Sequence, residues 1–315
     1  MPSILIPEQI VGVPIEALKE TFEVLSEPEL WKSPTRLKTV LPEFEALIVR
    51  NQTSVTAELI GAAKQLKVIG RLGVGLDNVD LRAAKAAGIM VVYAPEQNAI
   101  SVAELVMGLM ISLARNIPTA DRNTKAGGWE RQRFTGSELY GRTVGIVGLG
   151  RIGFRVGTRA LSFGMKVIAH DAYVHPDSLV VSELRARLVS LEALLREADF
   201  ITCHLPLTDE TRNIFDYETF CAMKPTGFFI NLSRGGVVDE DGLRRALQER
   251  RLAGVALDVR QQEPPEKCPL ATMDNVILTP HIGGLTVEAQ ERVLSSVCQD
   301  VVTVLNGGVP TNLIG

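Results

Sequence analysis

Short apolar runs rich in valine and isoleucine alternate with helix-like segments along nearly the whole chain. The segments between the runs are apolar on one face at helical spacing. This alternation predicts an α/β fold in which parallel sheets are covered by helices on both faces. Strands are predicted at 3–8, 45–50, 67–72, 89–94, 143–148, 166–171, 199–205, 227–232, 253–259 and 275–281, and helices at 55–66, 81–88, 151–164, 190–198 and 240–250.

Length and charge limit the classes of protein to consider. The 315 residues, 46% of them hydrophobic, are enough for two compact domains with substantial cores. The formal net charge of −4 argues against a nucleic-acid or anionic-membrane partner, which would favour a clustered basic face.

Cysteine usage and the absence of targeting signals predict a cytoplasmic protein. The N-terminus lacks the charged and long apolar regions of a signal peptide. The most apolar stretch, 101–116, contains Glu104 and is too short to span a bilayer. The cysteines are scattered without the paired spacing of a zinc site, which fits a reducing compartment, and no metal site is predicted: Cys203, Cys221, Cys268 and Cys298.

Two helices predict how the chain is divided. The segment 101–116 reads as one helix that is apolar all round, so it should be buried between domains or against another subunit. A polar, arginine-rich loop follows at 125–143. The final helix, 286–306, has no strand after it and is expected to cross back onto the first hundred residues. We therefore expect a discontinuous domain of residues 1–99 and 285–315 around a central domain of residues 100–284.

The segment "TVGIVGLGRIGFRV" has the G-x-G-x-x-G spacing at Gly148, Gly150 and Gly153. A strand precedes the glycines, a helix follows, and the next strand ends in an acidic residue, which is the context that a dinucleotide site requires. Gly148 permits the tight turn, Gly150 lets the backbone approach a pyrophosphate, and Gly153 lets the helix pack on the sheet. The helix N-terminus offers N–H groups to phosphates. Arg151 either adds a phosphate contact or points to solvent.

Asp171 ends the second strand of this unit, in "KVIAHD". By itself it could be a simple strand terminator. After a glycine motif, an acidic residue at this point is expected to accept hydrogen bonds from a ribose, and its charge favours NAD over NADP. The preceding His170 weakens the preference for NAD over NADP, because a protonated histidine there would offset the negative charge of Asp171. The predicted cofactor is NAD.

The histidines are the first candidates for proton transfer, because imidazole titrates near neutrality. His170 lies beside the predicted cofactor site, His175 lies in a loop, and His204 follows a strand in "TCHLPLT". His281, in "ILTPHIGG", ends a strand and is followed by two glycines. Because ligands of open α/β sheets sit at the carboxyl ends of strands, His281 is the predicted acid–base residue.

Two other strand ends carry suitable side chains. "FFINLSRGGVVDEDG" delivers Arg234 as the chain leaves the sheet, ahead of a helix that Asp239 would cap. "GVALDVRQQEPP" delivers Asp258 and Glu263. A glutamate held against a histidine fixes its tautomer and favours its protonated form. An arginine, a glutamate and a histidine on strand ends of one sheet form a constellation that suits an anionic substrate.

Five motifs in order, "GLGRIG", "NLSRGGVVDE", "ALDV", "EPP" and "PHIGG", resemble the NAD-dependent D-2-hydroxyacid dehydrogenases, with the phosphoglycerate dehydrogenase branch the most similar. "RLGVGLDNVDLRAAKAAGI" and "NAISVAELVMGLM" extend the resemblance over nearly the whole chain. The resemblance implies two doubly wound parallel-sheet domains, a Rossmann nucleotide-binding domain and a flavodoxin-like substrate domain, with the active site in the cleft between them.

The resemblance also implies residue roles. Arg234 would bind the substrate carboxylate and carbonyl oxygen, His281 would be the acid–base residue, and Glu263 would be its carboxylate partner. The backbone amides of Val74 and Gly75 would hold the substrate carboxylate. The helix containing "SVAEL" would form a homodimer through the 101–116 region. The implied cofactor-binding residues are Gly148, Gly150, Arg151, Ile152, Gly153, Asp171, His204, Leu205, Pro206, Thr208, Leu232, Ser233, Asp258 and Gly283.

Departures from the pattern leave the substrate open. Arg260 stands where the family usually has an aromatic residue, and it affects the substrate or has no role there. Arg50 either faces a second anionic group, as in 3-phosphoglycerate or 3-sulfolactate, or is a surface arginine. Arg131 and Arg133 are further candidates for reaching the site from the loop. If Arg50 is not engaged, small acids such as glycerate, glyoxylate or lactate fit. The longer phosphoglycerate dehydrogenases carry regulatory domains after this core, and the chain ends at Gly315.

Two other functions fit the same motifs. Transcriptional corepressors resemble these dehydrogenases and keep the catalytic trio, so an NAD-binding interaction protein is an alternative. A related oxidoreductase acting on formate or phosphite is another, although the carboxylate-binding groups suit a 2-hydroxy acid better.

Overall fold

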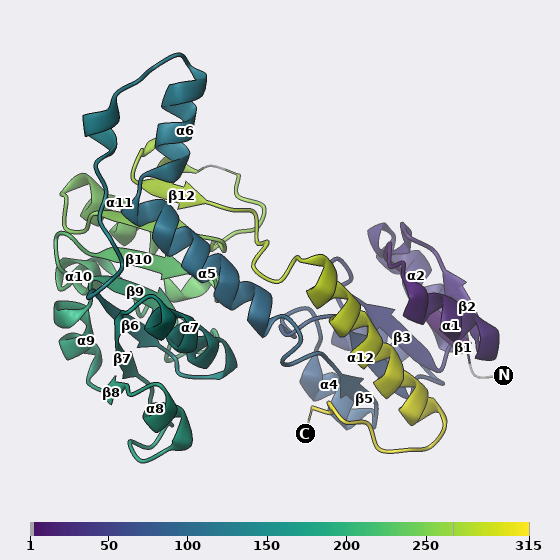
Figure 1. The fold of residues 1–315 in the computed structure, drawn as a ribbon. Coiled ribbons are helices and arrows are strands. Elements are labelled where there is room, and N and C mark those ends of the chain that lie inside the picture. The colour runs from purple at the N-terminus through teal and green to yellow at the C-terminus, as the bar shows by residue number, and fades with distance from the viewer. Residues whose placement is uncertain (1–2, 267, 315) are drawn as a thin grey trace. The chain divides into compact units, whose positions relative to one another are not determined.

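The computed structural model describes residues 3–266 and 268–314 and separates the chain into two compact units (Figure 1). Unit 1 comprises Met1–Asn98 and Thr286–Gly315, and unit 2 comprises Ala99–Leu285.

Unit 1 contains one sheet whose strands run in the order β2-β1-β3-β4-β5, and every pairing between these strands is parallel. This is the flavodoxin-like order. Its elements are β1 (Ser3–Ile6), α1 (Val13–Thr21), β2 (Glu23–Ser26), η1 (Leu30–Lys32), α2 (Pro34–Val40), η2 (Leu41–Glu43), β3 (Ala46–Val49), α3 (Ala57–Ala62), β4 (Val68–Arg71), α4 (Leu81–Ala86), β5 (Met90–Val92) and α12 (Val287–Leu305).

Two apolar clusters fill the two faces of this sheet. One cluster joins strand residues to α1 and α12, and the other joins them to α2, α3 and α4. Helix α12 packs on β4, where a Cβ added to Gly70 would lie 2.8 Å from Val301 and 2.9 Å from Val297. The expectation that the last helix crosses back onto the first hundred residues is therefore confirmed.

Unit 2 contains a second parallel sheet, in the order β12-β11-β10-β9-β6-β7-β8. Counted from β6, this is the usual order of dinucleotide-binding sheets, and its direction reverses between β6 and β9. Its elements are α5 (Ala99–Ala114), α6 (Ile117–Lys125), η3 (Arg131–Phe134), β6 (Thr143–Val147), α7 (Arg151–Ser162), β7 (Lys166–His170), α8 (Leu179–Glu183), β8 (Arg187–Leu188), α9 (Leu191–Glu197), β9 (Phe200–Cys203), α10 (Tyr217–Cys221), β10 (Phe228–Asn231), η4 (Gly235–Val237), α11 (Glu240–Gln248), β11 (Gly254–Leu257), η5 (Pro269–Thr272) and β12 (Val276–Leu278).

Helix α5 is the apolar helix singled out in the sequence. It packs against α7, β10 and β11 (Figure 1). Its residues Val106 and Met110 are completely buried in the same apolar cluster as the strands. Its apolar composition is thus accounted for inside unit 2, and no second subunit is needed to explain it. Among the described residues no single helix is long and apolar enough to cross a membrane; α5 and α6 meet that standard only as a pair bent by 62°.

All ten predicted strands are present, but β2 and β8 were missed. Both lie at sheet edges and carry exposed polar residues, so neither shows the apolar run that marks the central strands. The helices α1, α2, α6, α8 and α10 were also missed. They are short, with five to nine residues, and α6 has no buried residue from which an apolar face could be recognised.

Candidate active site

The glycine turn after β6 has the local geometry that its sequence predicts. Gly148 has φ of 92°, and a Cβ there would lie 2.9 Å from the backbone oxygen of His204. A Cβ on Gly153 would lie 2.2 Å from the Gly148 oxygen, so only glycine lets α7 start this close to the turn. Around Gly150, by contrast, an added Cβ meets nothing within 4 Å. The turn is open only at this position, where a ligand would approach the backbone.

The carboxylate of Asp171, just after β7, is tied to the glycine turn. It accepts hydrogen bonds from the N–H of Leu149 at 2.7 Å, of Tyr173 at 2.8 Å and of Val174 at 3.1 Å. Within the described residues no side chain caps the N-terminus of α7, which leaves the positive end of that helix for a phosphate. Of the neighbouring predicted contacts, Arg151 is exposed and Ile152 is partly buried.

The end of β9 faces the same turn, at the point where the strand order reverses. The Nε2 atom of His204 lies 3.0 Å from the Thr202 hydroxyl, and its Nδ1 atom is buried without a partner among the described residues. Burial lowers the pKa of His204 to about 3, so the ring is neutral. Leu205 packs on Gly148, and the hydroxyl of Thr211 bonds Pro206 and Thr208 in the following loop. An open glycine turn, an uncapped helix and an orphaned polar atom at one sheet edge fit a dinucleotide.

Arg234 follows β10 in a turn organised by Asn231, a completely buried side chain. Asn231 donates to the carbonyl of Arg234 at 2.9 Å and accepts from the N–H and the hydroxyl of Ser233 at 2.9 and 2.8 Å. The Arg234 guanidinium bonds the Ser233 carbonyl at 2.8 Å. Leu232 is buried in the core, while Ser233 is half-buried. The buried Asn231 side chain therefore fixes the turn that carries Arg234.

Asp258, at the end of β11, holds the loop that carries His281. Its buried carboxylate accepts from the Thr279 hydroxyl at 2.5 Å, from the Ile282 N–H at 2.9 Å and from the Gly283 N–H at 2.7 Å. The backbone of His281 has φ of 56°, a left-handed conformation that costs a non-glycine residue energy and persists only where its surroundings enforce it. Asp258 is part of that enforcement.

His281 and Glu263 form a direct pair. The Nδ1–H group of His281 donates to Glu263 Oε2 at 2.6 Å, while Glu263 Oε1 accepts from the N–H of Arg260 at 2.9 Å. The hydrogen bond with Glu263 raises the pKa of His281 above its ordinary value; partial burial opposes it, Asp258 adds to it, and Arg234 acts against it. Partial burial acts to raise the pKa of Glu263, but the hydrogen bonds from His281 and Arg260 outweigh it and hold that pKa below its ordinary value.

Arg234, Glu263 and His281 therefore lie within electrostatic reach of one another at one edge of the seven-stranded sheet. The other histidines are less suited to proton transfer. His204 is neutral, His170 bonds the Val189 carbonyl at 3.1 Å, and His175 is in an exposed loop, 3.6 Å from Asp177.

The substrate-binding residues expected in unit 1 lie at the corresponding edge of its sheet. Arg50 follows β3, and its Nε atom is buried without a partner among the described residues. Val74 and Gly75 lie in the loop after β4, and within the described part of the chain their N–H groups donate to no other residue. Burial lowers the pKa of Arg50, while the nearby charge of Glu8 opposes that change.

Glu8 explains how the loop after β3 keeps its shape. This buried carboxylate accepts from the N–H groups of Arg50, Gln52 and Thr53 at 3.0 to 3.3 Å. Asn78 closes the loop by donating to the carbonyls of Arg50 and Thr53.

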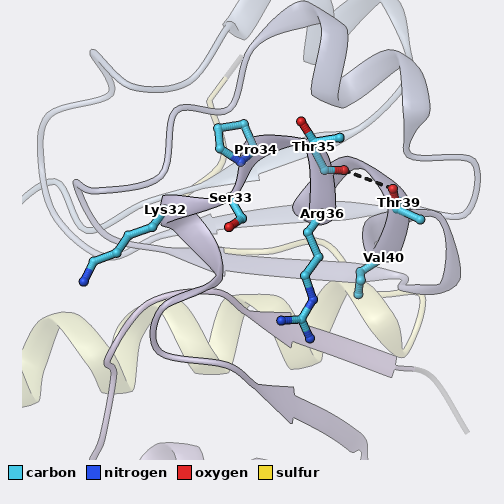
Figure 2. A pocket seen from close by; sticks show the side chains of 7 residues that line it. All are labelled: Lys32, Ser33, Pro34, Thr35, Arg36, Thr39 and Val40. Carbon is cyan, nitrogen blue, oxygen red and sulfur yellow. Dashed lines mark hydrogen bonds between the residues drawn. The ribbon is translucent and has the colours of Figure 1, made fainter.

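A surface hollow of about 730 Å³ in unit 1 contains none of the predicted site residues (Figure 2). Arg36, one of the residues that line it, forms an exposed ion pair with Glu27. The hollow lies over α2, which has seven residues. Its lining is Lys32, Ser33, Pro34, Thr35, Arg36, Thr39 and Val40.

Two of the open questions about arginines have structural answers. The Arg260 side chain is buried in an ion pair with Glu240, so it is occupied inside unit 2. Arg133 forms exposed ion pairs with Glu130 at 3.0 Å and with Asp274 at 3.7 Å, and Arg131 lies beside it in η3.

Several organising residues were not recognised from the sequence. Asn231 and Asp258 are polar residues at the ends of apolar strands, a signal that was read only for Asp258. Glu8, Asn78 and Glu240 lie in segments that the sequence pattern identifies, but their partners are distant in the sequence, so only the fold reveals those partners.

The fold and this edge of the second sheet define an oxidoreductase-like class of two-unit α/β proteins with a dinucleotide site. A sequence model described as "D-isomer specific 2-hydroxyacid dehydrogenase, NAD binding domain" matches residues 107–283. The chain belongs to the D-isomer specific 2-hydroxyacid dehydrogenase family, and the matched residues form its NAD-binding domain.

Individual relatives agree with this assignment. The chain is 44% identical to D-3-phosphoglycerate dehydrogenase of Methanocaldococcus jannaschii over all of its 315 residues, and it spans 59% of that relative's length. The TT0316 protein of Thermus thermophilus has a TM-score of 0.92 and 34% identity, covering 99% of this chain and 100% of its own. D-lactate dehydrogenase of Aquifex aeolicus, complexed with NAD and lactic acid, has a TM-score of 0.87 and 31% identity, covering 99% and 98%.

Proposed function

We propose that this protein is an NAD-dependent dehydrogenase that interconverts a D-2-hydroxy acid and its 2-oxo acid, and that its substrate carries a second anionic group, as 3-phosphoglycerate does. The observation that carries the proposal is the 2.6 Å hydrogen bond between Glu263 and His281 at a strained backbone position, within electrostatic reach of Arg234. The M. jannaschii relative supports the choice of substrate.

The residues would divide the work as follows. Arg234 binds the substrate carboxylate and stabilises negative charge that develops on the carbonyl oxygen. His281, protonated and held by Glu263, donates a proton from Nε2 to that oxygen, because Nδ1 is bonded to Glu263. In the opposite direction neutral His281 accepts the proton from the hydroxyl. Bound NADH supplies the hydride.

The cofactor would be held by unit 2. Backbone N–H groups at Gly150, Arg151 and Ile152 suit the pyrophosphate, and Asp171 suits a ribose. Asp258 serves by holding the loop of His281 and Gly283, since its carboxylate is bonded within the protein and is buried, whereas that of Asp171 is bonded but only partly buried. Unit 1 would contribute the free N–H groups of Val74 and Gly75 to the substrate carboxylate, and Arg50 to the second anionic group.

The decisive experiment is loss of NADH absorbance with purified protein and a panel of 2-oxo acids. The panel comprises phosphohydroxypyruvate, sulfopyruvate, hydroxypyruvate, glyoxylate and pyruvate. Preference for the doubly anionic members is expected and would support Arg50 as their binding residue. Preference for the small acids would contradict the assigned substrate and make Arg50 a structural residue. If the protein binds NADH but reduces none of these 2-oxo acids, the result would favour the alternative of an NAD-binding interaction protein.

The homodimer through residues 101–116 and the cytoplasmic location remain proposals that rest on the sequence. Most of α5 faces the core of unit 2, so its contribution to a dimer would come from the exposed edge at Glu104 and Gly108 and from α6, where Ile117 is exposed. Light scattering coupled to size-exclusion chromatography tests the dimer, and a monomer at micromolar concentration would contradict it.

A further inference from the structure

A buried ion pair lies directly behind the Glu263–His281 pair. Glu240, the first residue of α11, accepts hydrogen bonds from two of the three side-chain nitrogens of Arg260, with Oε2 2.6 Å from Nη2 and Oε1 3.1 Å from Nε. The third nitrogen of the guanidinium, Nη1, lies 2.9 Å from the Cys268 sulfur. The Arg260 side chain is 7% exposed and that of Glu240 is 21% exposed, so the contact is shielded from solvent.

This geometry is rigid for electrostatic reasons. Burial acts to raise the pKa of Glu240, but the hydrogen bonds from Arg260 and Gln261 prevail and hold that pKa below its ordinary value. A bidentate arginine–carboxylate contact fixes the relative orientation of both groups. Separating them would leave a charge without its partner in a poorly solvated place.

The pair is connected to the acid–base residues through the backbone of residues 260 and 261. Glu240 Oε1 also accepts from the N–H of Gln261 at 2.8 Å. The adjacent N–H, that of Arg260, donates to Glu263 at 2.9 Å, and Glu263 in turn binds His281 at 2.6 Å. One carboxylate therefore holds the short segment from which the other carboxylate is oriented.

The same segment also abuts the turn of Arg234. A Cβ added to Gly235 would lie 1.8 Å from the carbonyl oxygen of Arg260, so the backbone at 260 packs directly on the residue after Arg234. The side chain of Gln261 donates to the Val238 carbonyl at 2.7 Å and strengthens this junction. Displacing the segment would disturb both the carboxylate on His281 and the neighbouring arginine turn.

We propose that Glu240 and Arg260 form a positioning pair that holds the 260–261 backbone so that Glu263 stays aligned on His281, an inference that rests on the acid–base roles proposed above. Neither residue touches the reacting atoms. Arg260, for which the sequence left open whether it affects the substrate, thereby takes a structural place in the proton-transfer machinery of this chain.

The charges that face His281 allow this role to be separated from a direct electrostatic effect. They are Glu263 and Asp258, which raise the pKa of the imidazole, and Arg234, which lowers it. Removing the Arg260 charge alone would raise that pKa by a direct effect, because a nearby cation is lost. Loss of alignment would instead lower it, since the hydrogen bond with Glu263 weakens. The two explanations thus predict opposite signs.

The test uses the full chain with Glu240→Met and Arg260→Met together, which leaves the net charge unchanged and replaces the ion pair by apolar side chains of similar length. The matched control is Asp241→Met with Arg244→Met, the exposed pair one position along the same helix. The readout is the midpoint of the His281 imidazole in an NMR pH titration. Its signal is assigned by its absence from His281→Asn, and the sequence contains only 4 histidines.

We expect the midpoint of the double variant to fall by about half a unit to one unit, toward that of Glu263→Gln, with the control unchanged. The pH limb of kcat should move with it. An unchanged midpoint in a folded double variant, when Glu263→Gln lowers it, would overturn the proposal. If the double variant does not fold, the single variant Arg260→Met decides through the direction in which the His281 midpoint moves. A lower midpoint supports the positioning role, and a higher or unchanged midpoint refutes it.

The titration needs neither substrate nor turnover, so it separates this inference from the proposed function. A lowered midpoint in protein that is silent toward every 2-oxo acid would retain the positioning pair and reject the dehydrogenase. Turnover of a 2-oxo acid, together with an unaltered His281 midpoint in the double variant, would support the dehydrogenase and reject the positioning pair.

Discussion

The two sheets of this protein present polar residues at equivalent edges, yet use them differently. At the edge of the unit 1 sheet, the buried carboxylate of Glu8 accepts hydrogen bonds only from backbone N–H groups, those of Arg50, Gln52 and Thr53 among the described residues. At the edge of the unit 2 sheet, Glu263 divides its oxygens between the Arg260 N–H and the imidazole of His281. Similar architecture therefore supplies a structural acid in one unit and an acid coupled to a titrating base in the other.

The comparison teaches that proton chemistry needs more than a charged residue at a strand end. His281 combines a partner that raises its pKa, a strained backbone and half-exposed ring atoms. Arg50 in unit 1 has a fixed charge and a shape-holding loop, which suits recognition of an anion. We expect unit 2 to determine kcat and unit 1 to affect KM.

The largest expected effect belongs to His281→Asn. Loss of the proton donor should lower kcat for 2-oxo acid reduction by about 10²- to 10⁴-fold, with NADH binding unchanged. Stopped-flow and steady-state kinetics measure kcat, and fluorescence titration measures NADH binding. His175→Asn, in an exposed loop, is the control and should behave like wild type. Turnover that survives His281→Asn nearly intact would refute the acid–base assignment.

Glu263→Gln should have a smaller effect, with a characteristic pH signature. We expect kcat to fall by about 10-fold or more, as is usual when an orienting carboxylate is lost. The pKa of His281 is raised in the wild type, so its protonated form, and with it reduction, persists above pH about 6.5 and is lost as pH rises through the raised pKa. The variant should lose reduction at lower pH. If kcat of the variant falls at the same pH as kcat of the wild type, Glu263 does not set the pKa of His281.

Glu8→Gln tests the other side of the comparison. The amide cannot accept three N–H bonds as the carboxylate does, so the free energy of unfolding should fall by about 1–3 kcal/mol. Thermal or urea unfolding measures the change. The pH limb of kcat should stay where it is, and a displaced limb would mean that unit 1 also takes part in the proton chemistry.

Arg50→Met should give the smallest change. If Arg50 meets a second anionic group, KM for phosphohydroxypyruvate should rise by about fivefold, the equivalent of roughly 1 kcal/mol for a partly solvated charge pair. KM for hydroxypyruvate should not change. Arg36→Met, in the surface hollow of the same unit, is the matched control (Figure 2). Equal increases for both substrates would place Arg50 in a general structural role.

The candidate site could be anticipated only in part, because its members differ in how local their signals are. Gly148 and Gly153 were readable because their positions demand a backbone that other residues cannot adopt or a contact that a Cβ would block. Arg234, Glu263 and His281 were readable as strand-end residues. The ion pair of Glu240 and Arg260 was not, since its partners lie 20 positions apart and no local pattern relates them.

By itself, the sequence determined the strand–helix alternation, the ten apolar strands, the glycine turn and its cofactor class, because each depends on residue type and spacing along a short segment. Tertiary structure alone decided the two polar edge strands β2 and β8, the burial of α5 inside its own unit, and the carboxylates that hold the functional loops. Those features depend on which distant segments pack together. Hydrogen bonds formed by Glu8 and Glu240 exist only once the sheets have brought their partners within reach.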